Sequence, residues 1–159
     1  SLEAGESAYG IQIDAFDSDA DGTQYPFLYG DVGGTEYFSI NRVGNIRWLG
    51  TLITTPSTVQ TLAAGTAILA NATQVQINST GNVTSTAAPT IANGTDGQVL
   101  TIINVDTADT ITLSDQGTLA NSNLRLSTTT YAMAPRDNLK LIYNSTVGDW
   151  VEIGRTNVI

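Results

Sequence analysis

Apolar residues in this chain fall on alternate positions within short runs, and turn-forming residues separate the runs. In Asn138–Tyr143 the alternate positions are Leu139, Leu141 and Tyr143. A period of two is typical of a strand with one buried face. Similar runs recur about every 8–12 residues, which is the spacing of sandwiches and barrels. The pattern therefore predicts an all-β protein.

The first third of the chain, residues 1–53, is predicted to be a β-meander. Its expected strands are separated by an acidic turn at Asp17–Gly22, by Gly30–Gly34 and by Gly44-Asn45, where Gly and Asn tolerate turn conformations. These strands are Tyr9–Phe16, Tyr25–Tyr29, Thr35–Ile40 and Asn45–Leu49. An isolated hairpin is only marginally stable in water, so such short strands need further sheet.

Residues 54–159 are predicted to form a second domain, a small β-sandwich or barrel. Val59–Ala64 fits either one helical turn or a strand. The remaining runs are candidate strands, and Gln98–Asn104 is rich in β-branched residues, which favour strands. These runs are Thr66–Ala70, Gln74–Ile77, Val83–Thr86, Gln98–Asn104, Thr110–Leu113, Asn123–Ser127, Thr130–Met133, Asn138–Tyr143 and Trp150–Ile153.

Charge is unevenly distributed along the chain. The net charge is -9, yet no Lys, Arg, Asp or Glu occurs from Trp48 to Thr95. One interpretation of this span is a Thr- and Asn-rich sheet with a solvated face. The other is a surface that packs against identical copies, because charged residues are depleted at interface cores and like charges facing each other are costly.

Composition excludes several functions. The chain has no His and no Cys, so it lacks the commonest general base and metal ligand and any thiolate chemistry, and we expect no enzymatic activity. Its acidic clusters lie in predicted turns. Six scattered basic residues form no phosphate-binding patch, so we expect no nucleic-acid partner. No apolar run approaches the roughly 20 residues that span a bilayer, so we expect no membrane insertion.

Asp17, Asp19, Asp21 and Gly22 match the first half of a calcium-binding loop. Alternate carboxylates can converge on one hard cation, and Gly allows the sharp turn. The glutamate expected six residues after the glycine is replaced by Leu28. The alternatives are an acidic hairpin turn without metal and a Ca²⁺ site completed by other residues; otherwise no cofactor is expected.

In Gly34–Leu52 a Gly-Thr pair is followed by an aromatic-Ser-Ile run, an Asn, a Gly-Asn turn and a closing Gly-Thr-Leu. This pattern resembles the segment that recurs in the shafts of bacteriophage tail fibres and related virion fibres. The resemblance implies a virion structural protein, a homotrimer with intertwined strands, located on the virus exterior and in contact with capsid or tail proteins. The apolar residues expected at the interface between copies are Phe38, Ile40, Ile46, Trp48 and Leu52. The matching residues are Gly34, Thr35, Phe38, Ser39, Ile40, Asn41, Gly44, Asn45, Ile46, Gly50, Thr51 and Leu52.

The C-terminal half resembles the compact β-domains of phage fibre and virion-appendage proteins through Gly97–Asn104, Pro135–Tyr143 and Trp150–Ile153. The chain is shorter than long tail fibres, which favours a head fibre, a decoration protein or a filament subunit. The alternative function is a carbohydrate-binding module that stacks host surface glycans on exposed aromatics, while the other role of an aromatic on a strand is core packing. The candidates are Tyr25, Phe27, Tyr29, Tyr37, Trp48 and Trp150.

Overall fold

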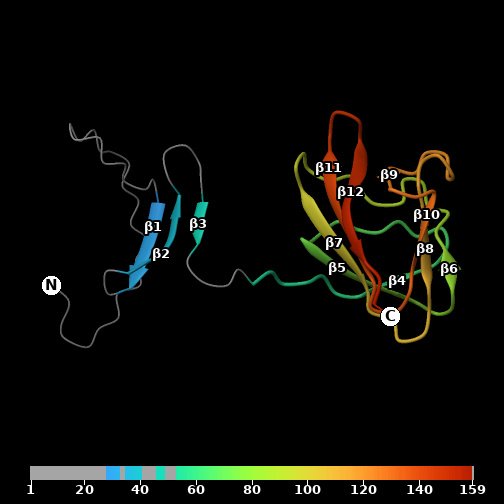
Figure 1. Ribbon diagram of the computed structural model, residues 1–159, viewed down its shortest axis with the longest axis horizontal. Coiled ribbons are helices and arrows are strands. Elements are labelled where there is room, and N and C mark those ends of the chain that lie inside the picture. The colour runs from blue at the N-terminus through green and yellow to red at the C-terminus, as the bar shows by residue number, and fades with distance from the viewer. Residues whose placement is uncertain (1–27, 33–34, 41–45, 49–52, 159) are drawn as a thin grey trace. The chain divides into compact units, whose positions relative to one another are not determined.

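The computed structural model describes residues 28–32, 35–40, 46–48 and 53–158, in two compact units, Ser1–Ile53 and Thr54–Ile159 (Figure 1). Every regular element within the described residues is a β-strand, which confirms the all-β prediction. Val59–Ala64 contains a strand rather than a helical turn.

The described part of the first unit is a three-stranded antiparallel meander. It consists of β1 (Leu28–Val32), β2 (Thr35–Ile40) and β3 (Ile46–Trp48), in that order. The predicted turn at Gly30–Gly34 is wrong for its first three residues, because Gly30, Asp31 and Val32 belong to β1. A register shift between Gly30 and Asp31 lets the strand continue past the glycine while it pairs with β2.

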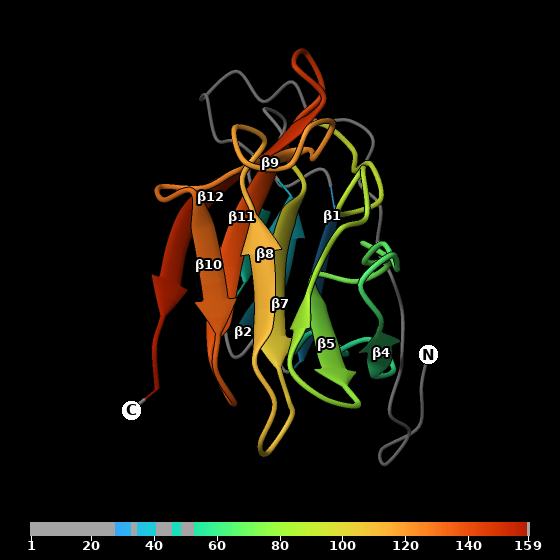
Figure 2. The ribbon, with the colours of Figure 1, turned by 90° about the vertical axis from the view of Figure 1, so that its right-hand side faces the viewer.

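The second unit contains two sheets (Figures 1 and 2). The six-stranded sheet has the order β4 (Gln60–Leu62), β5 (Gln74–Ser79), β7 (Val99–Asn104), β11 (Asn138–Asn144), β12 (Asp149–Thr156), β9 (Leu124–Arg125). The three-stranded sheet has the order β10 (Thr130–Met133), β8 (Ile111–Ser114), β6 (Val83–Thr84).

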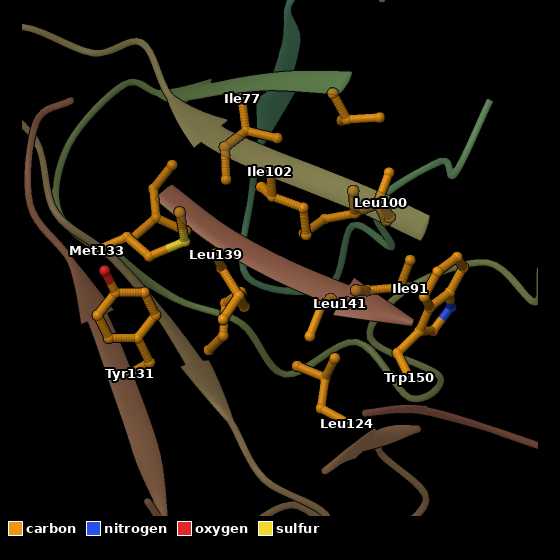
Figure 3. Packing of buried hydrophobic residues seen from close by; sticks show 14 of the residues in the cluster. Ile77, Ile91, Leu100, Ile102, Leu124, Tyr131, Met133, Leu139, Leu141 and Trp150 are labelled. Atoms are coloured by element: carbon orange, nitrogen blue, oxygen red, sulfur yellow. The ribbon is translucent and has the colours of Figure 1, made fainter. Parts of the chain in front are cut away.

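The two sheets enclose one hydrophobic core, as predicted for a sandwich or barrel (Figure 3). Alternate residues of β7 and β11, such as Ile102 and Leu141, point into it, together with Leu113 of β8 and Met133 of β10. All four are fully buried. Each Å² of apolar surface that is removed from water stabilises the fold by about 25 cal/mol, so this core makes the main stabilising contribution.

Trp150 anchors the closing strand from inside the core. Its indole Nε1 donates a hydrogen bond to the carbonyl of Ala92 at 3.0 Å, and its ring lies 5.0 Å from that of Tyr143. Gly94 packs directly on the indole, because a Cβ at that position would lie 2.7 Å from Cζ2 of Trp150. The ring is therefore held from several sides.

Thr66–Ala70 is not a regular strand, contrary to the prediction. It contributes only an isolated parallel bridge between Ile68 and Ile91. At Leu69 the side chain of Gln60 takes the place of a partner strand: its amide accepts from the Leu69 N–H and donates to the Leu69 carbonyl, both at 2.9 Å. These backbone groups are thus satisfied without a sheet.

Candidate assembly surface

The charge-free part of the second unit comprises residues 54–95 and includes β4, β5 and β6. Its buried positions follow the strand period: Val75 and Ile77 of β5 and Leu62 of β4 point into the core. Its outward side chains are mostly Thr, Asn and Gln. The span therefore supplies both core and surface. We call the outward-facing side chains of residues 54–95 the charge-free surface.

Exposed apolar side chains interrupt the polar ones on the charge-free surface. Val59 is 45% exposed and Leu69 is 54% exposed. The Gln60–Leu69 hydrogen bonds connect the strand that follows Val59 to the loop that carries Leu69. Contiguous exposed apolar patches are a feature of protein interaction sites, whereas single exposed apolar side chains are common on protein surfaces.

Asp106 lies at the end of β5 and bounds this surface. Its Oδ2 accepts a hydrogen bond from the Ser79 N–H at 3.2 Å, and its Oδ1 accepts from the N–H groups of Thr107, Ala108 and Asp109. The backbone donors, that of Ala108 first, lower the pKa of this carboxyl. Asp106 is thus a turn-stabilising residue with its acceptors in use.

Charged side chains gather instead around β9 and β12. Asp149 is buried and accepts a hydrogen bond from Nε of Arg125 at 2.6 Å. Glu152 pairs with Arg155, whose guanidinium lies 4.2 Å from the ring centroid of Tyr131. The bonds from Arg155, followed by those from Ser127, lower the pKa of Glu152 to about 2. Burial, aided by the charge of Asp137, raises the pKa of Tyr131 to about 12.

These groups are also connected to the loop that follows β9. Arg155 also donates to the hydroxyls of Ser127 and Thr128, and Glu152 accepts from the Ser127 N–H. The network joins the β9–β10 connection to β12. The hydrogen bonds and the ion pair of this network hold the β9–β10 connection against β12.

The residues proposed from sequence for the oligomer interface lie in the first unit. The β2–β3 register places Phe38 opposite Trp48 and Ile40 opposite Ile46, and Ile46 is 66% exposed. Leu52 lies outside the described residues. Their role as an interface remains a prediction.

The proposed calcium ligands Asp17, Asp19 and Asp21 also lie outside the described residues. Within the residues that are described, no three acidic side chains come together in a way that could hold a metal ion. In the same residues, none of the elements is a helix with the length and apolarity needed to cross a membrane.

The aromatic candidates for glycan stacking divide between the units. The second unit has three aromatic residues, Tyr131, Tyr143 and Trp150, and each is at most 5% exposed. Trp150 therefore serves the core, and the second unit presents no aromatic platform. Tyr25 and Phe27 lie outside the described residues, and Tyr29, Tyr37 and Trp48 belong to β1, β2 and β3.

Comparison with known proteins does not indicate the function of this chain. No family model and no curated protein matches the sequence. A chain in a solved structure described as a chaperone-substrate complex is similar over 77% of this chain and 20% of its own length. The identity is 19% and the TM-score 0.38, so this similarity carries no argument about function.

Sequence reasoning located the charge-free span but missed the Gln60–Leu69 contact and the Arg125–Asp149 pair. Neither had a local signal, because the partners are 9 and 24 residues apart and meet only through sheet formation.

Proposed function

We propose that this chain is a non-enzymatic structural protein of a virion, fibre-like or capsid-decorating, that assembles as a homotrimer on the virus exterior. The observation that carries the proposal is the charge-free surface on an all-β unit of a chain whose net charge is -9. Identical copies repel one another through their net charge. They approach most easily where neither copy carries charge.

The resemblance of Gly34–Leu52 to fibre shafts supplies the virion context and the expected count of three. Under this proposal, capsid or tail proteins are further partners. The apolar residues Phe38, Ile40, Ile46, Trp48 and Leu52 supply a second contact between copies.

The alternative is a carbohydrate-binding module for host surface glycans. The burial of all three aromatics in the second unit weighs against it there. Under this alternative, the stacking aromatics belong to residues 1–53, which contain eight of the eleven aromatic residues of the chain.

The test is the solution mass of the full chain by light scattering behind size exclusion. The proposal expects about three times the chain mass of 16.7 kDa, independent of added sugars. A monomer at micromolar concentration would contradict it. A monomer whose Trp fluorescence is quenched by glycans would support the alternative instead.

A further inference from the structure

The two ends of the six-stranded sheet differ in how they are protected. At the β9 end, the Leu124 carbonyl accepts from the Gln116 N–H at 3.0 Å, and the Leu126 N–H donates to Oδ2 of Asp115 at 2.8 Å. The β8–β9 connection thus covers this edge with backbone and with a carboxylate. Charges at an edge strand also discourage pairing with other chains.

The β4 end is open among the described residues. Within the six-stranded sheet β4 pairs with β5 alone, and it lies at the sheet edge beside β5 (Figure 2). An open edge presents unpaired N–H and C=O groups to any strand that approaches.

The register identifies which backbone groups of β4 face away from β5. The Thr73 carbonyl accepts a hydrogen bond from the N–H of Thr101 in β7, and the Ile77 carbonyl accepts one from Val105, which follows β7. The Gln74 carbonyl instead accepts from the Ser57 N–H on the β4 side. In a parallel ladder, bonding alternates along each strand. Because Ile77 lies opposite Gln60 and bonds toward β7, Gln60 and Leu62 make the bonds to β5. The N–H and C=O of Thr61 therefore face away from the sheet.

The open section is short and well defined. It ends at Ala63, whose carbonyl accepts from the Thr66 N–H at 2.9 Å and whose N–H donates to Oγ1 of Thr66 at 3.4 Å. The open section thus comprises the backbone groups of Thr61, and the exposed side chain of Val59 immediately precedes β4.

We propose that a second copy of this chain pairs an extended segment with the open β4 edge, which continues the sheet between subunits. This inference rests on the proposed function and gives its interface an atomic description. The occupant is an identical chain because the edge lies in the charge-free surface, which offers no charge to recognise a charged partner and none to repel a copy of itself. Strand addition supplies affinity through main-chain hydrogen bonds.

The deciding variant is Thr61→Pro in the full chain. Proline removes the outward N–H and is tolerated on edge strands, while the β5-facing groups of Gln60 and Leu62 stay intact. Its matched control is Thr61→Val, which keeps the backbone donor and a β-branched side chain. We expect Thr61→Pro to reduce the measured mass from that of the oligomer toward the 16.7 kDa of the monomer and Thr61→Val to leave the oligomer unchanged.

A second variant decides the matter if the proline protein fails to fold. Thr61→Glu keeps the donor and adds a negative charge at the edge, and Thr146→Glu adds the same charge in the exposed turn between β11 and β12. We expect only Thr61→Glu to dissociate the oligomer. Near-ultraviolet circular dichroism checks that each protein is folded.

The outcomes separate the two proposals. A wild-type oligomer that survives both Thr61→Pro, when folded, and Thr61→Glu overturns the β4 interface but leaves the proposed function standing. A wild-type monomer overturns both.

Discussion

Replacing Gly94 by Ala tests whether the core around Trp150 is as tightly packed as the distances imply. The added Cβ would lie 2.7 Å from Cζ2 and 2.9 Å from Cη2 of Trp150, and 2.9 Å from Oε1 of Gln98. Such separations are about 1 Å shorter than the optimum for carbon contacts. Either the backbone or the indole must move.

The indole has little freedom to move. It is fully buried, its Nε1 donates to the Ala92 carbonyl, and Tyr143 packs on it. Overpacking a well-packed core costs typically about 1–3 kcal/mol, and we expect about 2 kcal/mol for Gly94→Ala because two rigid elements meet there. This corresponds to about a 30-fold fall in the folding equilibrium constant.

The matched control is Gly65→Ala, where an added Cβ meets nothing within 4 Å. We expect this substitution to be neutral or to stabilise by up to about 1 kcal/mol, because alanine restricts the unfolded chain. The free energy of unfolding is measured by urea titration, with circular dichroism as the signal. The sample is either the fraction that elutes at the monomer mass or the whole protein, with all variants at the same concentration. A second arm combines Gly94→Ala with Trp150→Phe, which removes the clashing ring atoms.

Two results would refute this reasoning. One is equal stability of Gly94→Ala and Gly65→Ala. The other is strict additivity in the cycle with Trp150→Phe, because residues in contact are expected to couple by about 0.5–3 kcal/mol.

Two further predictions concern the charged side chains near β12. Because the pKa of Glu152 is lowered in the folded state to about 2, its contribution to stability is present above its ordinary pKa and is lost as the pH falls toward about 2. Glu152→Gln should therefore flatten the fall of the urea midpoint between about pH 4.5 and 2, and an unchanged acid limb would contradict the assignment. Arg125→Met should destabilise the fold by about 1–3 kcal/mol in urea titrations, since it leaves the buried Asp149 carboxylate unpaired. The double variant with Asp149→Asn should recover part of the loss, and no recovery would show that the charge pair is not the cause.

The sequence by itself determined most of the strands of the second unit and the faces that they bury. The period of two in Asn138–Tyr143 places Leu139, Leu141 and Tyr143 in the core, as the structure confirms. Such patterns are local, because each strand carries its own alternation. The prediction of a turn at Gly30–Gly34 was wrong for Gly30–Val32, because pairing with β2 extends β1 through these residues. Such pairing is not a local property of the sequence.

Only the tertiary structure decided which strands became edges and which side chains met. The order β4-β5-β7-β11-β12-β9 brings together segments far apart in sequence and leaves β4 at one end. The run of residues without charge was visible in the sequence, but its coincidence with an open edge was not. Whether Thr61 faces a neighbour or solvent depends on the register against β5, which side-chain patterns leave undetermined in a three-residue strand. The candidate interface is therefore a product of sheet order and register, and composition indicated only where in the chain to look for it.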